Sequence, residues 1–482
     1  MSLLGLTATG VCSMIGASIY VVPFMIQRNV PGIGPYVLPA FLFASIPAIL
    51  AAVAYAILGS AMPRAGGSYI YASRGLHPYL GFVASFSQWF GLSIAIGVVS
   101  YVIIPFFGDI AQALGYLDIA HFLMKGMSRV TLSLLILWLF VWVNIRGLKL
   151  YELTLIPLMI MMFLLGAIVI YVGFTHSSEE FASALLAKTN QTIPAGEVSF
   201  DPVIFLSASA VLFASFIGFD SIAQAGGEAV NPGRNIPLAI GLAVGTVSTF
   251  YLLFSGAVYH VVPWQFVAAQ AAEKDVAAPG LIGILLSPGW TVAIVAGAAI
   301  ALTNDLPSML LSVSRLMFAW AEDGIFPSGV TRVHQKFRTP HVALIVSGIV
   351  ASFGILGSHF AGDFFLGIDI MVTSMLVNFL LMCVTVITLP SRNPELARHV
   401  KVIRNRNMQL VLAGSGTLIL LGFLTVHLIK DATAEASAWY FHSTPVWLIV
   451  MLLASLLYFR ELRGLRIRGI DEQKLFSKLP QE

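Results

Sequence analysis

"SMIGASIY", residues 13–20, lies in the middle of the first apolar run of the chain, residues 3–27. A helix that crosses a bilayer needs about 20 predominantly apolar residues, and this run supplies them. Gly16 and Ser18 interrupt the run, and Pro23 follows soon after. Glycine loosens a helix, and proline removes one of its hydrogen bonds. The stretch therefore predicts a membrane-spanning helix and raises the question of why small residues interrupt it near its centre.

The whole chain has the composition of a membrane protein. Its 482 residues are 58% hydrophobic and 10% charged, with a mean hydropathy of +0.89, whereas soluble domains carry about 25% charged residues. Cys12 and Cys383 are the two cysteines, which is too few for a disulfide framework and lacks metal-ligand spacing. The net charge of +3 is too small to suggest a nucleic-acid partner. We expect no metal and no cofactor.

Apolar runs recur along the chain and predict an all-α polytopic membrane protein with about twelve transmembrane helices. Helices are the default for such runs because every backbone polar group in lipid must be hydrogen-bonded internally. The predicted spans are 3–27, 35–60, 79–112, 130–146, 150–174, 203–226, 236–262, 290–321, 341–357, 364–390, 408–430 and 445–460.

Lysine and arginine are distributed unevenly between the two sets of loops. With the N-terminus inside, 19 of the 26 Lys and Arg residues fall on the inner side and six on the outer side. Basic residues gather in cytoplasmic loops. We therefore expect a multi-pass protein of the plasma membrane with both termini in the cytoplasm. The first apolar run is too long for a cleavable signal peptide and has no small-residue cleavage site.

A loose internal repeat links two of the predicted spans. "MIGASI" (14–19) has a partner in "FIGFDSI" (216–222), and the two Ile-Gly pairs stand 202 residues apart. Five helices separate them, so the second copy enters the membrane upside down. Glycine-interrupted helices in two inverted halves point to the central binding site of a transporter. Close helix packing is the alternative, because small residues also let helices approach.

Four longer stretches resemble the amino acid–polyamine–organocation superfamily of secondary transporters, which have the LeuT-like fold. They are GVCSMIGASIYVVP (10–23), AMPRAGGSYIYASRGLHPYLGFVASFSQW (61–89), FASFIGFDSIAQAGGEAVNPGRNIPLAI (213–240) and LLSVSRLMFAWAEDGIFP (310–327). The resemblance implies one transporter domain, residues 1–482. It would consist of two inverted five-helix repeats (1–175 and 202–390) and two further helices (408–460).

The resemblance also implies a substrate site at the two helix breaks. Backbone amides at a half-helix N-terminus suit a carboxylate, and carbonyls at a half-helix C-terminus suit an ammonium group. The expected substrate-binding residues are Ile15, Gly16, Ala17, Ser18, Phe213, Ala214, Phe216, Ile217, Met309 and Trp89. Ser18 stands where the family usually has glycine, which we interpret as a difference in specificity. A pocket of this kind suits a neutral or apolar amino acid.

Acidic residues within membrane segments are costly and usually functional. We expect proton-linked or gating roles for Asp220, Glu228, Asp305 and Asp369. Asp305 is also compatible with a hydrated position near the outer surface, and a cavity-facing Asp305 would favour a cationic substrate. Glu228 is expected at an inner gate, with Arg64 or Arg234 as its partner.

The coupling ion stays open at the level of sequence. The family's Na⁺ site would correspond to the carbonyls of Cys12 and Ile15 together with the side chains of Ser312 and Val313 in the predicted span 290–321. Of these two side chains only Ser312 has a hydroxyl group. A hard cation needs several oxygen ligands, so we interpret the site as vestigial. Residues 151–166 hold no lysine that could replace the ion. Proton-coupled symport and amino acid exchange both remain.

These features together predict an amino acid permease that works by alternating access. An amine or polyamine transporter or antiporter of the same fold is the main alternative, and an amino acid-sensing transceptor is a weaker one. Enzyme motifs such as H-E-x-x-H and G-x-S-x-G are absent from the sequence, as is a channel filter signature. Loop 112–129 holds no cysteine, so we expect no covalent partner subunit. The expected partners are then the substrate and the lipid bilayer, with a proton as coupling ion in the symport alternative.

Overall fold

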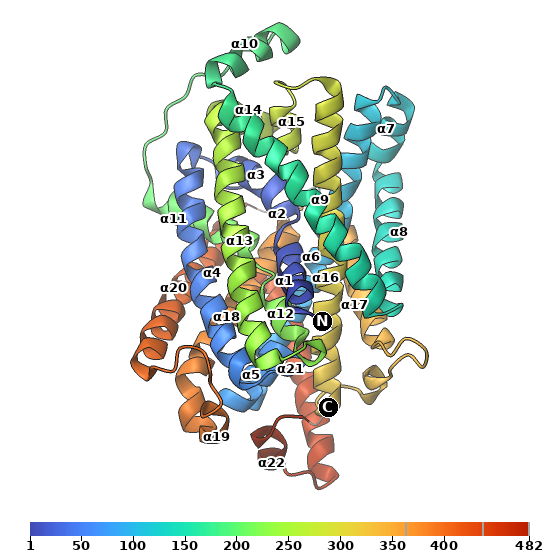
Figure 1. Cartoon of the computed structure of the whole chain (residues 1–482), viewed down its shortest axis with the longest axis vertical. Helices are drawn as coiled ribbons and strands as arrows, with labels where there is room; N and C mark the ends of the chain where they lie inside the picture. Colours follow the sequence, from blue (N-terminus) through green and yellow to red (C-terminus); the bar gives the residue numbers. More distant parts are fainter. Residues whose placement is uncertain (362–363, 436–437, 481–482) are drawn as a thin grey trace.

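The computed structural model describes residues 1–361, 364–435 and 438–480, with the exception of the side chains of Ala17, Ser18, Leu148 and Pro288. Throughout these ranges the chain forms helices joined by turns and loops, with no strand among them. The helices stand side by side in an elongated bundle (Figure 1). The predicted all-α class is therefore confirmed.

Ten of the described helices are long and apolar enough to cross a membrane. Each has at least 20 residues, which is enough to span a hydrocarbon core of about 30 Å. They are α4 (Val37–Ala61), α6 (Pro78–Ala113), α8 (Gly126–Ile145), α9 (Leu148–Thr175), α13 (Pro232–Val261), α16 (Pro288–Glu322), α17 (His341–Ala361), α18 (Phe365–Arg392), α20 (Arg406–Thr433) and α21 (Ser443–Ile467).

Two further spans are helices interrupted near their centres. The first consists of α1 (Leu3–Met14), α2 (Ala17–Tyr20) and α3 (Val22–Asn29). The second consists of α11 (Pro202–Leu212), the 3₁₀ turn η2 (Phe213–Phe216) and α12 (Asp220–Gln224). Together with the ten continuous helices they account for the twelve spans that the sequence predicts.

The continuous helices divide into central and peripheral ones. Most residues in the apolar segments of α6, α16 and α18 are buried, whereas most of those in α8, α9 and α21 are half-buried or exposed. α6 packs along both α16 and α18 and so forms the middle of the bundle. Apolar side chains that face outward, such as Leu164 and Leu452, suit contact with lipid tails.

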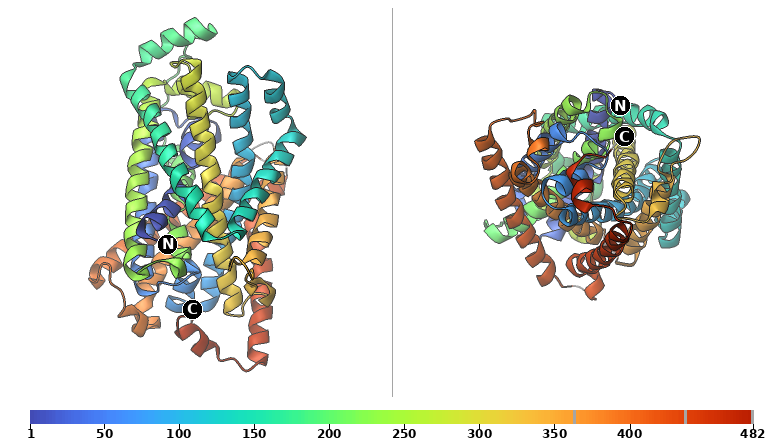
Figure 2. Two further views of the ribbon diagram at one scale, coloured as in Figure 1. Left: turned by 45° about the vertical axis from the view of Figure 1, so that its right-hand side comes forward. Right: turned by 90° about the horizontal axis from the view of Figure 1, so that it is seen from below.

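Short helices cap the two ends of the bundle. The upper end in Figure 1 carries α7 (Leu117–Met124), α10 (Ser178–Thr189), α14 (Trp264–Glu273) and α15 (Ala278–Ile282). The lower end carries α5 (Gly67–Gly75), α19 (Pro394–Ala397) and α22 (Glu472–Ser477). Both chain ends lie in the lower half of the molecule (Figures 1 and 2). The upper end corresponds to the predicted outer side and the lower end to the inner side.

Candidate functional site

The two helix breaks lie directly against each other. Gly218, in the second break, has φ = +135°, a conformation that side chains rarely adopt. A Cβ atom at this position would lie 2.5 Å from the carbonyl carbon of Ser13 and 2.8 Å from the amide nitrogen of Met14. Only a glycine therefore lets the second break approach the backbone of the first one so closely.

The first break is stabilised by a bond from outside its own helix. Ile15, which follows α1, has an extended backbone (φ −94°, ψ 98°), so the helix stops at Met14. The freed carbonyl of Met14 accepts a hydrogen bond from the hydroxyl of Tyr251 in α13. Buried carbonyls need such partners. The side chains of Ala17 and Ser18, which the sequence places in the substrate site, lie outside the described residues.

The second break is stabilised from within its own segment. Ile217 is extended (ψ 135°) after η2. The Asp220 carboxylate accepts a hydrogen bond from the Gly218 amide over 3.1 Å, and the Ser221 hydroxyl donates to the Gly218 carbonyl over 2.5 Å. Asp220 thus fixes the turn that precedes α12, and it is the first residue of that helix, which is a favourable place for a negative charge.

A small pocket of about 40 Å³ lies beside the two breaks. Four of the predicted site residues contribute to its wall: Ala214, Ile217, Asp305 and Met309. The remaining lining residues are Ser13, Val22, Ala95, Val98, Val99, Val102, Phe364, Ile368 and Met371. Cavity volume of this kind holds one water molecule per about 10–15 Å³, so the pocket has room for a few waters and must widen before it can hold an amino acid.

Asp305 faces the first break from α16. A Cβ on Gly16 would lie 3.0 Å from the Asp305 carboxyl carbon. Only 5% of the Asp305 surface is exposed, which excludes the hydrated surface position that the sequence left open. The acid and Gly16 therefore belong to one site.

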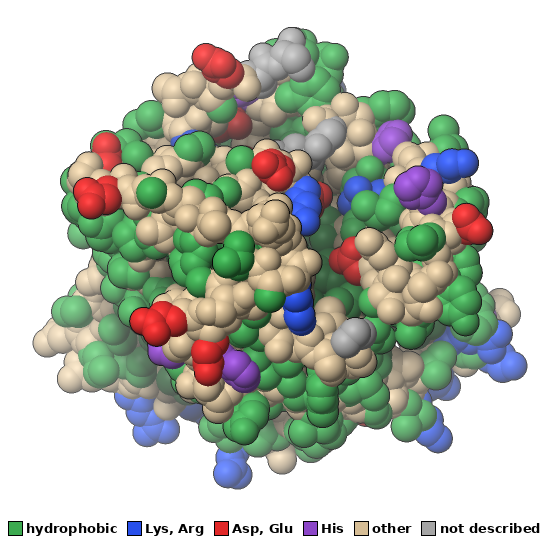
Figure 3. Space-filling model, turned by 90° about the horizontal axis from the view of Figure 1, so that it is seen from above, with side chains coloured by type: hydrophobic (Ala, Val, Ile, Leu, Met, Phe, Trp, Pro, Cys, Tyr) green, Lys and Arg blue, Asp and Glu red, His purple; other side chains and the backbone are tan. Residues whose placement is uncertain are grey.

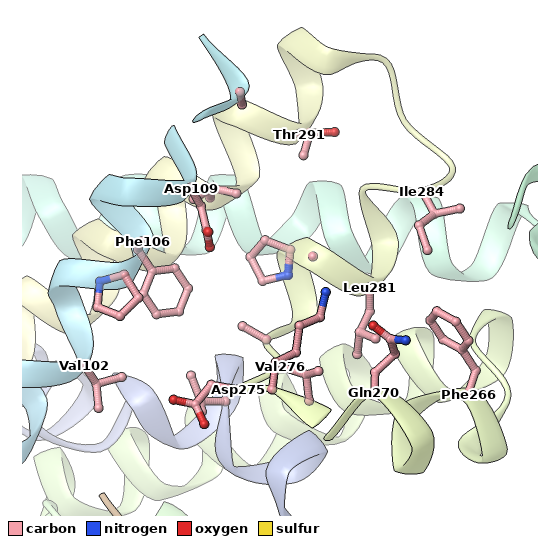
Figure 4. Close-up of a pocket in the computed structure, with 18 of the residues that line it drawn as sticks. Val102, Phe106, Asp109, Phe266, Gln270, Asp275, Val276, Leu281, Ile284 and Thr291 are labelled. Carbon is pink, nitrogen blue, oxygen red and sulfur yellow. The ribbon is translucent and has the colours of Figure 1, made fainter. Parts of the chain in front are cut away.

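A larger cavity of about 470 Å³ lies on the upper side of the molecule (Figure 4). Val102 and Phe364 line both this cavity and the central pocket, so the two spaces adjoin. The close-up shows Phe106 and Asp109 of α6 on one side and Leu281 and Phe266 on the other.

Charged residues surround the upper cavity. Asp109, Arg129, Lys274 and Asp275 are among its lining residues, and Asp275 pairs with Arg28 over 3.0 Å. The space-filling view of this face shows acidic and basic side chains beside a hollow (Figure 3). The cavity therefore offers charged groups of both signs above the central pocket.

Asp220 also belongs to a buried polar network. Its carboxylate accepts a hydrogen bond from Gln88 of α6. Ser68 of α5 donates to Gln88, and Gln224 donates to Ser68 over 2.9 Å. All four side chains are buried. The network connects the second break to α6 and to the short inner helix α5.

Ion pairs close the inner side of the bundle. Glu228 pairs with Arg315 of α16, a partner that the sequence did not predict. Sequence reasoning missed Arg315 because it placed this arginine within an apolar helix, away from the loops. Glu228 thereby connects the end of the second interrupted span to α16.

A second inner pair joins α5 to the end of α16. Arg74 contacts Asp323 over 2.6 Å, and both side chains are almost fully buried. The Tyr69 hydroxyl donates to the same carboxylate over 2.5 Å. Burial and the adjacent Asp323 charge raise the pKa of Tyr69 well above its usual range. The hydroxyl therefore stays protonated and remains a donor.

Two of the predicted site residues, Trp89 and Asp369, lie away from the central pocket. Trp89 donates to Ser347 over 3.0 Å and lines a separate apolar cavity between α6, α17 and α18. Asp369 lies 3.6 Å from Lys430 in a pocket formed with the end of α20. Neither is among the residues that line the central pocket.

The two aromatic residues of η2 pack against other helices. Phe213 contacts the ring of Phe379, and Phe216 contacts the rings of Phe41 and Tyr251. Their side chains thus anchor the turn, while the turn's backbone lies beside the pocket through Ala214.

One residue of the predicted cation site, Cys12, contacts α16 through its side chain. The Cys12 sulfur accepts a hydrogen bond of 2.9 Å from Asn304 of α16. Because a helix rises 1.5 Å per residue, Ser312 and Val313 lie about 12 Å further along α16. Asn304 and Asp305 therefore lie beside the first interrupted span, about two helical turns before Ser312 on α16. Among the described residues no group of three metal-ligating side chains is present.

Sequence reasoning missed most of the pocket wall. Val98 and Val99 of α6, and Ile368 and Met371 of α18, carry no motif that separates them from other apolar helix residues. Only the position of each helix face relative to the breaks brings them together.

The chain is similar to known permeases along most of its length. A family model described as "Amino acid permease" matches residues 1–454. The chain is 32% identical over 198 residues to the branched-chain amino acid permease BcaP of Bacillus subtilis, a segment that covers 40% of each chain. It is 30% identical over 165 residues to the human cationic amino acid transporter 4, which covers 33% of this chain and 25% of the relative. The methylthioribose transporter of Bacillus subtilis is 29% identical over 203 residues, covering 41% of each chain.

Proposed function

The chain belongs to the amino acid permease family, and from this premise we propose that it is a secondary amino acid transporter that works by alternating access. Family membership confirms the resemblance drawn from the sequence motifs and the expectation of a transporter rather than an enzyme. The aligned segments span at most 41% of the relatives' lengths, so substrate and mechanism are argued from this chain's own residues.

The contact between the two helix breaks is the observation that carries the proposal. Interrupted helices free backbone amides and carbonyls at membrane depth, which is tolerated where they line a cavity. Here the breaks at Gly16 and Gly218 adjoin one pocket. The amides at the start of α2 would hold the substrate carboxylate, and the carbonyls of η2 would hold its amino group.

The cavities and ion pairs support a transport cycle that starts from the outer side. The upper cavity of about 470 Å³ adjoins the central pocket, while the Glu228–Arg315 and Arg74–Asp323 pairs hold the inner side together. Substrate would enter from above and widen the pocket. The two inner ion pairs would then separate as one group of helices rocks against another. The first group consists of the two interrupted spans with α4 and α13, and the second consists of α6, α8, α16 and α17.

Proton-coupled symport or amino acid exchange would drive the cycle. Asp220 is the candidate proton carrier because it is fully buried at the second break and connects through Gln88 to the central helix α6. A proton on this carboxylate would weaken the hydrogen bond that it accepts from the Gly218 amide and thereby couple protonation to the geometry of the break.

The remaining features of the proposal concern topology. The protein is multi-pass, and we place it in the plasma membrane with both termini in the cytoplasm, because Lys and Arg gather in the predicted inner loops. Spans 1–5 and 6–10 would form inverted repeats, with α20 and α21 added. The corresponding positions of the two interrupted spans in the sequence support this arrangement.

A binding screen followed by uptake tests the proposal. The purified protein is heated with each common amino acid, because a ligand that binds the folded state raises its melting temperature. We expect a subset of amino acids to stabilise the protein and the same subset to accumulate in proteoliposomes. Stabilisation by none of them, with no uptake, would contradict the proposal.

A further inference from the structure

The Asp305 carboxylate lies unpaired beside the first helix break. The side chain comes from α16, lines the central pocket and is only 5% exposed. Its Oδ1 atom has no hydrogen-bond partner among the described residues. Gly16 stands so close that a methyl group there would contact the carboxyl group. Glycine at this position therefore keeps the carboxylate accessible to whatever occupies the pocket.

The rest of the pocket wall does not neutralise a negative charge. Its other members are apolar apart from the Ser13 hydroxyl, and no Lys, Arg or His is among them. A buried carboxylate without a partner is costly, since a medium of low polarity cannot replace its hydration. A positive charge that enters this pocket would thus be stabilised strongly, and the protein itself does not supply one there.

The chemistry of the wall favours an organic cation over a metal ion. Na⁺ or Mg²⁺ needs several oxygen ligands, whereas the side chains here offer one carboxylate and one hydroxyl. The valine, isoleucine and methionine side chains suit the hydrocarbon part of a molecule that carries an ammonium group. A substrate carboxylate held at the amides after Gly16 would also lie close to Asp305, so a second positive charge would offset their repulsion.

We propose that Asp305 is the counter-ion for an ammonium group of the substrate, so that the central pocket selects basic amino acids or organic diamines over neutral amino acids. The inference rests on the proposed transport function and names the substrate class of that same pocket. It replaces the neutral substrate that the sequence favoured.

Three probes of matched length separate the charges involved. L-norleucine carries one ammonium and one carboxylate, L-lysine adds a second ammonium, and 1,5-diaminopentane has the two ammonium groups without the carboxylate. Affinities come from thermal-shift titrations of the full chain, with sodium chloride alone as a further arm. We expect L-lysine, 1,5-diaminopentane or both to bind at least tenfold more tightly than L-norleucine. Tighter binding of L-lysine than of 1,5-diaminopentane would show that the site also requires the substrate carboxylate.

The Asp305→Asn variant tests the role of the charge itself. The asparagine has nearly the same size, so we expect the basic probes to lose at least tenfold in affinity while L-norleucine binds equally well or better. The melting temperature without ligand should stay the same or rise, because an unpaired buried charge is removed. Asp118→Asn in the exposed helix α7 is the matched control and should bind all probes like the wild type.

Three results would overturn the inference. The first is L-norleucine binding as tightly as both basic probes in the wild type, a comparison that does not depend on whether the variant folds. The second is a well-folded Asp305→Asn variant that keeps wild-type affinity for the basic probes. The third is stabilisation by sodium chloride alone that disappears in the variant. If the protein still transports neutral amino acids in these cases, the proposed transport function stands and only the inference about Asp305 fails. If the protein neither binds nor transports any probe or amino acid, the proposed function and the inference both fail.

Discussion

Replacing Gly218 by alanine tests whether contact between the two breaks is essential. The residue adopts φ = +135°, and a non-glycine residue held in such a region costs about 1–3 kcal/mol. The added methyl group would also press on the main chain of Ser13 and Met14, and overpacking of a tight contact typically costs about 1–3 kcal/mol. The two effects together destabilise the packed arrangement by about 2–6 kcal/mol.

The lower end of this range already gives a large effect on binding. A cost of about 2 kcal/mol reduces the equilibrium ratio of packed to separated molecules about thirtyfold. If only the packed arrangement binds and the variant populates mainly the separated one, the apparent affinity for substrate falls in proportion to this ratio. Titration of the purified Gly218→Ala variant with a substrate identified by the screen measures this loss.

Gly241→Ala is the matched control for this experiment. Gly241 lies in α13, and a Cβ there would meet no atom within 4 Å, so the change should leave binding unaltered and stabilise the helix slightly. A monodisperse Gly218→Ala protein that binds substrate within threefold of the wild type would refute the reasoning.

Three further variants examine the inner pair and the proton-linked acid. Asp323→Asn leaves the buried Arg74 without its carboxylate and should lower stability by about 3–5 kcal/mol, seen as a lower melting temperature. The double variant Arg74→Met/Asp323→Leu should recover most of the lost stability. Equal melting temperatures for Asp323→Asn and the wild type would show that the ion pair does not stabilise the fold. Asp220→Asn should flatten the pH dependence of uptake in proteoliposomes, because an amide cannot carry the proton. An unchanged pH profile would make Asp220 purely structural.

The spans and breaks could be predicted from the sequence because each depends on local composition. An apolar run of about 20 residues is a helix in lipid, and the structure begins and ends most of the long helices within a few residues of the predicted bounds. The interruption at Ile15 and Gly16 follows from small residues within such a run. The extended Ile217 and the positive φ of Gly218 follow the same logic in the second span.

The orientation of side chains within each helix could not be predicted in the same way. Trp89 and Val98 lie on the same helix, yet one faces α17 and the other faces the pocket. Rotation and tilt of a buried helix depend on packing against its neighbours. The partner of Glu228 is Arg315, 87 residues away, and such long-range pairs leave no trace in local spacing.

The most direct test of the central claim is binding of an identified substrate to the Ile217→Trp variant. Ile217 is buried at the second break and lines a pocket of only about 40 Å³, which an indole ring would fill. Ile349→Trp, on the exposed face of α17, is the control of equal size change. The account predicts that saturable binding disappears in Ile217→Trp and persists in Ile349→Trp. Wild-type affinity in a well-folded Ile217→Trp protein would contradict the placement of the substrate between the two breaks.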